Sequence, residues 1–210
     1  MGFFLESEKL IRIIKQISEK LDEKQKIKDQ LLPIIKEGVA LASLIIHSLH
    51  INDFDSADHN LEKLEHLLDE VKKNTHQYPD LYYGNFLLTL FQEYSEAKLF
   101  YQIVRDKKIS TPEELDVPYA AYLLGLADLI GELRRKILSL IRNNDIDAAM
   151  NLGDVILEIY DAINMIKVSD SIAPGFRHKK DVARSLVDRT QSDLLNALLV
   201  SKLEKIRKDV

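Results

Sequence analysis

The chain has 210 residues, 46% of them hydrophobic and 30% charged, with seven Gly, five Pro and neither Cys nor Trp. This length allows one domain with a sizeable core, and the composition excludes disulfide scaffolds, thiolate metal sites, cysteine nucleophiles and collagen-like or Pro-rich disordered chains. The net charge of −5 argues against a simple basic nucleic-acid binder.

The spacing of apolar residues predicts helix along nearly the whole chain, because such residues recur every three or four positions. A first helix is expected at about residues 6–50, and Pro33 interrupts it, since a proline inside a helix kinks or restarts it. Asn52-Asp53 then caps a second helix that runs to about residue 74. A third helix starts at Tyr78-Pro79-Asp80 and continues to about Val104.

Three further helices are expected in the second half of the chain. Ser110–Glu114 combines a cap, a proline at the first helical position and acids in the first turn, and Pro118 restarts a long helix to about residue 142. Residues 143–145 break the chain and cap a helix to about residue 168, and the last helix spans about residues 178–208. Six long helices with short connections predict an all-α, up-and-down bundle, organised as one domain over residues 1–210.

Carboxylates interrupt the apolar pattern of two of these helices. In the third, Glu93 lies in a stripe of otherwise apolar residues and Glu96 follows three positions later on the same edge. In the fourth, Asp128 and Glu132 are spaced i, i+4 beside an apolar stripe. Unpartnered buried carboxylates are costly, so these groups require positive partners.

Two glycines accompany the carboxylates of the fourth helix. Gly125 and Gly131 each cost about 1 kcal/mol relative to Ala inside a helix. Such glycines allow neighbouring helices to approach closely or leave room for a ligand.

Side by side, the two helices bring four carboxylates together: Glu93, Glu96, Asp128 and Glu132. Carboxylates from facing helices build metal sites in bundles, and oxygen ligands without Cys favour Mg²⁺ or Mn²⁺. Such a cluster can activate water and stabilise a phosphoryl displacement. The alternative is that these acids lie on solvated flanks and pair with Arg134, Arg135 or Lys98.

Charge is distributed unevenly along the chain. Residues 50–100 hold four Lys or Arg against ten Asp or Glu, whereas residues 176–210 hold nine against five. Arg177, Lys180 and Arg184 share one helix face and can hold phosphates without reading sequence, although a solvated face is the alternative. The six His match no zinc pattern, and we interpret them as structural or solvent-facing.

A membrane or secreted location is not expected. No uncharged apolar run approaches the roughly 18 residues of a membrane span. The N-terminal segment MGFFLESEKL has no basic region and is acidic by Glu6, unlike a secretion signal. We therefore expect a soluble, cytoplasmic protein.

Three segments resemble the translin superfamily, most closely its translin-associated factor X branch. They are FQEYSEA (residues 91–97), YLLGLADLIGELRRKILSLIRNNDID (122–147) and VILEIYDAINMI (155–166). The family pattern has QEYVEA and YLLGVADLTGEL at the first two places. The resemblance covers roughly residues 53–198, while the helices of residues 1–52 match weakly.

This resemblance implies an all-helical fold of about seven helices that assembles into a barrel-shaped homo-oligomer, typically an octamer, around RNA. It also implies a Mg²⁺-dependent endoribonuclease, because the family's catalytic glutamates fall on Glu93 and Glu96, its aspartate on Asp128 and an adjacent acidic position on Glu132. We expect these residues to hold Mg²⁺ or Mn²⁺, and the basic residues that bring in RNA to be Arg177, Lys180, Arg184, Arg134 and Arg135. The alternatives are a non-catalytic assembly that binds RNA or single-stranded DNA, and a scaffold whose acids pair with neighbouring Arg.

Overall fold

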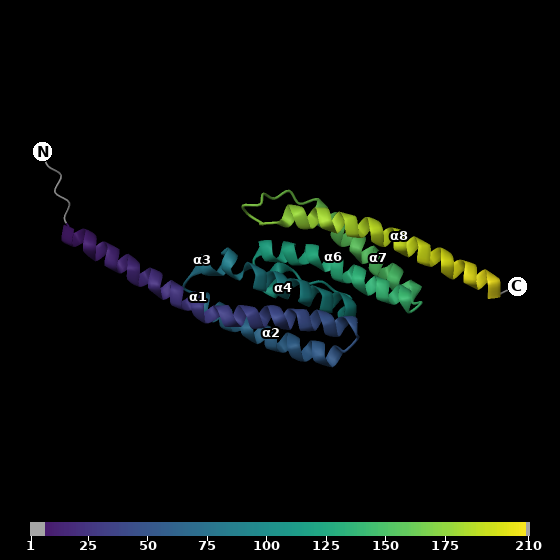
Figure 1. Cartoon of the computed structure of the whole chain (residues 1–210), viewed down its shortest axis with the longest axis horizontal. Helices are drawn as coiled ribbons and strands as arrows, with labels where there is room; N and C mark the ends of the chain where they lie inside the picture. Colours follow the sequence, from purple (N-terminus) through teal and green to yellow (C-terminus); the bar gives the residue numbers. More distant parts are fainter. Residues whose placement is uncertain (1–6, 209–210) are drawn as a thin grey trace.

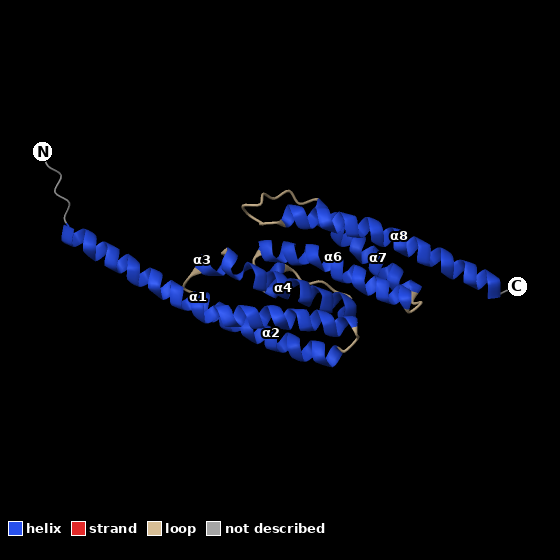
Figure 2. Cartoon of the chain, in the orientation of Figure 1, coloured by secondary structure: helices blue, strands red, loops and turns tan. Residues whose placement is uncertain are grey.

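The protein is all-α. The computed structural model describes residues 7–208, so the expected helix start at Glu6 lies outside the described residues, and the described chain contains no strand (Figure 2). The predicted fold class is therefore confirmed. Six long helices match the six expected ones: α1 (Ser7–His50), α2 (Phe54–Thr75), α4 (Asn85–Tyr101), α6 (Tyr119–Arg142), α7 (Ile146–Asn164) and α8 (Phe176–Lys208).

The third expected helix is divided into three parts. α3 (Pro79–Tyr82) is separated from α4 by a break at Gly84, where a Cβ would lie 2.5 Å from the carbonyl oxygen of Asp80. After α4 the chain forms a π-helical segment, η1 (Gln102–Asp106), which ends at Lys107 in the left-handed conformation with φ 52°. The short α5 (Pro112–Leu115) follows.

Pro33 does not divide α1, which is continuous from Ser7 to His50. Of the two expected effects of Pro33, a kink or a restart, the restart does not occur, because the loss of one backbone donor is tolerated inside this long helix. The N-terminal part of α1 slopes away from the bundle, and its C-terminal part packs along α2 and α4 (Figure 1).

The long helices pack in a simple order. α1 pairs with α2 and also contacts α4, α4 contacts α6, and α6 contacts both α7 and α8 (Figure 1). The core between them contains fully buried side chains from each layer, such as Ile45, Leu64, Phe91 and Leu129. α6 thus lies between the acidic helix α4 and the basic helix α8.

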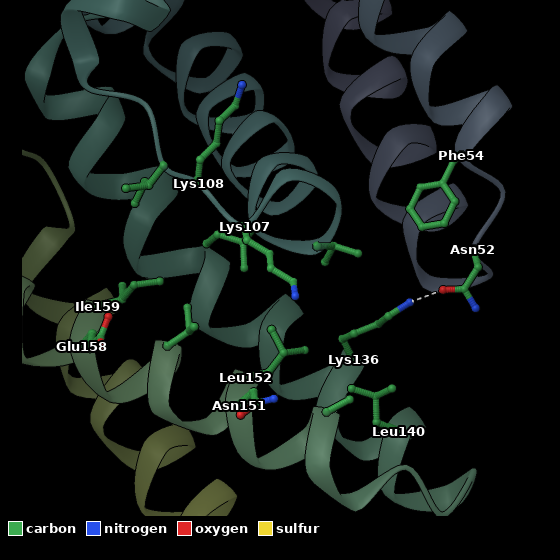
Figure 3. Close-up of a pocket in the computed structure, with 15 residues that line it drawn as sticks. Asn52, Phe54, Lys107, Lys108, Lys136, Leu140, Asn151, Leu152, Glu158 and Ile159 are labelled. Carbon is green, nitrogen blue, oxygen red and sulfur yellow. Dashed lines mark hydrogen bonds between the residues drawn. The ribbon is translucent and has the colours of Figure 1, made fainter.

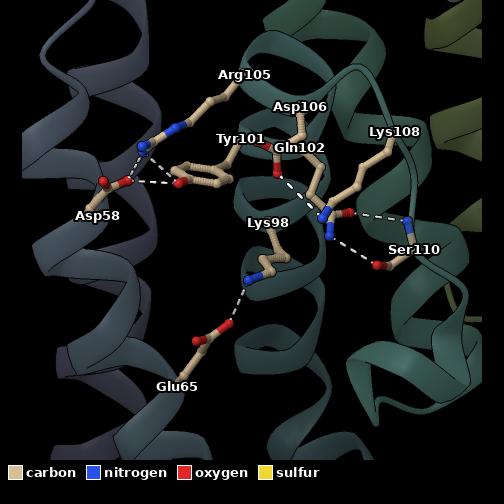
Figure 4. A network of polar contacts seen from close by, with 9 residues as sticks. All are labelled: Asp58, Glu65, Lys98, Tyr101, Gln102, Arg105, Asp106, Lys108 and Ser110. Atoms are coloured by element: carbon tan, nitrogen blue, oxygen red, sulfur yellow. Dashed lines mark hydrogen bonds and ion pairs between the residues drawn. The ribbon is translucent and has the colours of Figure 1, made fainter.

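Polar contacts fix α4 and η1 against their neighbours (Figure 4). The Tyr101 hydroxyl donates to Asp58 Oδ1 at 2.7 Å, and Lys98 Nζ lies 2.7 Å from Glu65 Oε1. The Gln102 amide group donates to Ser110 Oγ at 2.9 Å and accepts from the Ser110 backbone N–H at 3.0 Å. The C-terminal end of α4 is therefore held by α2 and by the segment that follows η1.

α1 is the one helix of the described chain that is long and apolar enough, by length and composition, to cross a membrane. The sequence analysis considered only runs without any charge, whereas the apolar stretch of α1 spans 18 residues and includes at most two charged ones. The apolar character has another use in the bundle, since 33% of this 18-residue stretch is buried. Ala42, Ile45 and Leu49 of α1 are completely buried among the other helices.

Candidate functional site

Gly125 lets the backbones of α4 and α6 touch. A Cβ at this position would lie 2.7 Å from the carbonyl oxygen of Gln92 and 2.9 Å from the amide nitrogen of Glu96. Gly131 is different, because the nearest atom to its Cβ would be a Leu186 carbon at 3.8 Å. One glycine thus permits close approach and the other leaves room, which are the two uses that the sequence suggested.

The room beside Gly131 is a cavity of about 400 Å³ between α4, α6 and the first turns of α8. Three of the four predicted carboxylates line it, namely Glu96, Asp128 and Glu132. Glu93 is not a lining residue of this cavity. It lies close enough to Glu96 and Asp128 for its charge to raise the pKa of Glu96 and for the charge of Asp128 to raise its own pKa. α8 completes the wall with His178, Lys179, Val182 and Leu186.

Burial changes the protonation of the two glutamates on α4. Glu96 is only 8% exposed, and burial together with the negative charges of Asp128, Glu93 and Glu132 raises its pKa to about 8. Burial and the charge of Asp128 also raise the pKa of Glu93, while the Lys179 ammonium opposes both shifts. Glu96 is therefore mostly neutral at pH 7 in this arrangement, and a bound cation would release its proton.

Asp128 is held from two sides. Lys179 Nζ lies 2.7 and 2.8 Å from its two carboxylate oxygens, and the Gln92 side-chain amide donates to Oδ2 at 2.8 Å. The sequence analysis noted the basic segment that opens α8 but did not select Lys179. Its position one residue before Lys180 turns it by about 100° around the helix axis, and this rotation points it at the carboxylates.

Glu132 is paired with a histidine from α1. His50 Nε2 lies 2.5 Å from Glu132 Oε2, and this hydrogen bond lowers the pKa of Glu132. Arg135 lies farther away, with Nη1 3.7 Å from the same oxygen. The imidazole packs against the Phe100 ring at a centroid distance of 5.0 Å. The sequence offered no motif around His50, so only the fold shows that it belongs to the site.

The donor set suits a hard divalent ion, since every candidate ligand is a carboxylate oxygen. In the described conformation, however, no three His, Asp or Glu side chains within residues 7–208 converge closely enough to hold an ion. Lys179 already forms an ion pair with Asp128, and His50 is hydrogen-bonded to Glu132. An ion at Asp128 would therefore have to replace the Lys179 ammonium.

The five predicted RNA-binding residues do not gather at the cavity. Arg134 joins α6 to α8, through Thr190 Oγ1 at 3.0 Å and Asp193 Oδ2 at 2.8 Å. Lys180 Nζ donates to the carbonyl oxygen of Ile166 at 3.3 Å, beyond the end of α7. The other three are exposed to solvent: Arg135, Arg177 and Arg184.

The raised pKa of Glu96 predicts how stability depends on pH. The folded state holds this proton up to about pH 8, whereas an ordinary glutamate has a pKa of 4.5. The folded state therefore binds more protons between these values, and its stability falls as pH rises through this window. We expect the Tm of Glu96→Gln to exceed that of the wild type by several degrees more at about pH 8.5 than at about pH 5.5.

Melting curves in EDTA, by circular dichroism, measure this difference. Glu62→Gln, at an exposed position on α2, is the matched control and should follow the wild type at both pH values. If the Tm difference between Glu96→Gln and the wild type is the same at both pH values, Glu96 does not hold a proton near neutral pH.

Comparison with known proteins gives consistent matches over most of the chain. The sequence profile of the Translin family matches residues 6–196, which includes the N-terminal helix that the motifs matched weakly. The uncharacterised protein MJ0175 of Methanocaldococcus jannaschii is 27% identical over 193 residues, which cover 90% of this chain and 85% of that protein.

Solved structures share the fold. The structure of AfC3PO in complex with duplex RNA has a TM-score of 0.82 at 28% identity, and the crystal structure of AfC3PO has 0.80 at 29%. Both matches cover 89% of this chain and 97% of AfC3PO. Apo-NeC3PO, at 24% identity and a TM-score of 0.72, shares the fold over 93% of this chain and 100% of its own.

Proposed function

The chain belongs to the Translin family, and on that premise we propose that it is a metal-dependent endoribonuclease of the translin-associated factor X type. The observation that carries the proposal is the convergence of Glu96, Asp128 and Glu132 on one cavity, with Glu93 beside them. RNA as the substrate is supported by the relative AfC3PO, whose structure was solved with duplex RNA.

The residues that would hold Mg²⁺ or Mn²⁺ are Glu93, Glu96, Asp128 and Glu132. When bound, such an ion polarises a phosphoryl oxygen and lowers the pKa of water toward neutrality. Around it, Gln92 orients Asp128 by its hydrogen bond, and His50 keeps Glu132 ionised. Before an ion binds, Glu96 holds a proton up to about pH 8, and ion binding would release that proton.

Lys179 has two uses in this proposal. It neutralises Asp128 before an ion is present, and it lines the same cavity, where its charge can attract a phosphate. The exposed Arg135, Arg177 and Arg184 are candidates for holding RNA phosphates elsewhere, together with Lys180 and Arg134. We further propose a cytoplasmic homo-oligomer, an octamer as in the family, that encloses the RNA.

Competition between Lys179 and the ion provides a test of this site. Lys179→Met removes the ammonium from Asp128, so we expect it to bind Mn²⁺ about tenfold more tightly than the wild type. Asp128→Asn should bind Mn²⁺ at least about tenfold more weakly, because a ligand is lost. Isothermal titration calorimetry of metal-free protein measures both changes.

The matched control is Lys180→Met. Lys180 is the next residue along α8 but contacts the carbonyl oxygen of Ile166 instead of the carboxylates, so its Mn²⁺ affinity should equal that of the wild type. Equal affinities in all four proteins would contradict a metal site at Asp128.

A non-catalytic RNA-binding assembly is the second candidate. It is favoured by the contacts that Asp128 and Glu132 already make within the protein, an ion pair with Lys179 and a hydrogen bond with His50. RNA affinity would then be unaffected by EDTA and would fall steeply with salt, and no RNA would be cut under any metal condition.

A further inference from the structure

A second cavity lies apart from the carboxylates, farther along α6 toward its C-terminal end. It has a volume of about 640 Å³, is partly open to solvent and is bordered by the start of α2, η1, α6 and α7 (Figure 3). This volume is in the range of pockets that bind small molecules. Its wall is mostly aliphatic, with Phe54 as its single aromatic member among the described residues. Examples of the apolar lining are Ile103, Leu140, Leu152, Val155 and Ile159.

A buried lysine reaches this cavity from α6. Lys136 is only 6% exposed, and its Nζ donates to the Leu49 carbonyl oxygen at 2.8 Å and to Asn52 Oδ1 at 2.7 Å. Both partners are neutral, and within residues 7–208 no carboxylate lies at ion-pair distance from this ammonium. A buried charge without a counterion is unfavourable, and burial lowers the pKa of Lys136 accordingly.

The other charged groups of the lining leave the cavity positive. Lys107 and Lys108 follow η1 at the rim, and Glu158 is the one acidic lining residue in the described part of the chain. Figure 3 shows the side chain of Lys107 pointing into the space between η1 and α6 and the Lys136 ammonium directed at Asn52 at the edge of this space, whereas Lys108 points away from it. Two ammonium groups therefore approach one end of an aliphatic pocket.

We propose that this cavity binds a small amphipathic anion, in which a carboxylate or phosphate headgroup is attached to an aliphatic chain. The headgroup lies beside Lys136 and Lys107 and supplies the negative charge that Lys136 lacks. The chain lies along the wall formed by Leu140, Leu152 and Val155. An aliphatic body fits better than a nucleobase, because Phe54 alone offers an aromatic face for stacking.

Calorimetric titration of the full chain with three probes tests the proposal. Decanoate and decyl phosphate carry the two headgroups, and 1-decanol carries the same chain without a charge. We expect at least one of the anions to bind, and to bind about tenfold or more tightly than the alcohol. The anion that binds with the higher affinity identifies the preferred headgroup.

Two variants locate the binding. Lys136→Met keeps the length of the side chain but removes the charge, and should weaken the anion about tenfold or more. Val155→Phe fills the cavity without changing charge and should abolish binding of all three probes, which keeps the test valid if Lys136→Met does not fold. Lys72→Met is the control and should bind like the wild type, because Lys72 lies on α2 away from the cavity and is paired with Asp116.

Three results would overturn the proposal: no heat from either anion with folded wild-type protein, equal affinity for anion and alcohol, or unchanged anion affinity in folded Lys136→Met and Val155→Phe.

Discussion

Asp128→Asn is expected to lower the rate of RNA cleavage by on the order of 10²-fold or more, while RNA binding stays within about twofold of the wild type. Asp128 is the carboxylate that contacts both Lys179 and Gln92, and its charge influences Glu93 and Glu96. The amide removes the charge but keeps the shape. Single-turnover cleavage and filter binding with the same labelled RNA separate the two effects.

The matched control for this variant is Asp58→Asn. Asp58 is also an ion-paired aspartate, bonded to Arg105 and Tyr101 in the contact between α2 and α4 (Figure 4). It does not line the carboxylate cavity, so its variant should retain cleavage. If the double variant Glu96→Gln/Asp128→Asn cleaves RNA at the wild-type rate, the carboxylate cluster is not the active site.

Gly125→Ala is expected to destabilise the fold by about 1–3 kcal/mol, in contrast to Gly131→Ala. The new methyl group at residue 125 meets backbone atoms of Gln92 and Glu96 at 2.7 and 2.9 Å, so α4 and α6 must separate. At residue 131 the nearest atom is at 3.8 Å, and the better helix propensity of Ala stabilises by up to about 1 kcal/mol.

Urea unfolding at one protein concentration measures both variants, because the concentration must be fixed if the protein is an oligomer. Separation of the helices also moves Glu96 relative to Asp128, so Gly125→Ala should lose cleavage as well as stability. Equal stability of the two variants would contradict the close contact of α4 with α6.

The long helices could be predicted because their ends carry explicit signals. Asp53 accepts a hydrogen bond from the Ser56 amide, and Asp145 accepts one from the Ala148 amide. Thr111 supplies the cap expected in the segment Ser110–Glu114, and with Glu114 it forms a capping box. The break at Gly84 and the π-helical η1 were missed, since an apolar period of three to four residues continues through both of them.

The carboxylates could be predicted because helical spacing places Glu93 with Glu96 and Asp128 with Glu132. Their partners could not, since His50 and Lys179 come from α1 and α8, which are distant in sequence from α4 and α6. Lys136 was missed for a related reason. It follows two arginines in an apparently solvated run, and only the fold shows that it is buried and reaches Leu49 at the end of α1 and Asn52 in the next turn.

The most direct test of the proposed endoribonuclease uses a circular single-stranded RNA, which has no ends for an exonuclease. Purified full-length protein is incubated with this RNA in Mg²⁺, in Mn²⁺ and in EDTA. The account predicts linear products and shorter fragments with either metal and an intact circle in EDTA. A circle that stays intact in all three conditions, although the protein binds it, would contradict the account and leave an RNA-binding assembly.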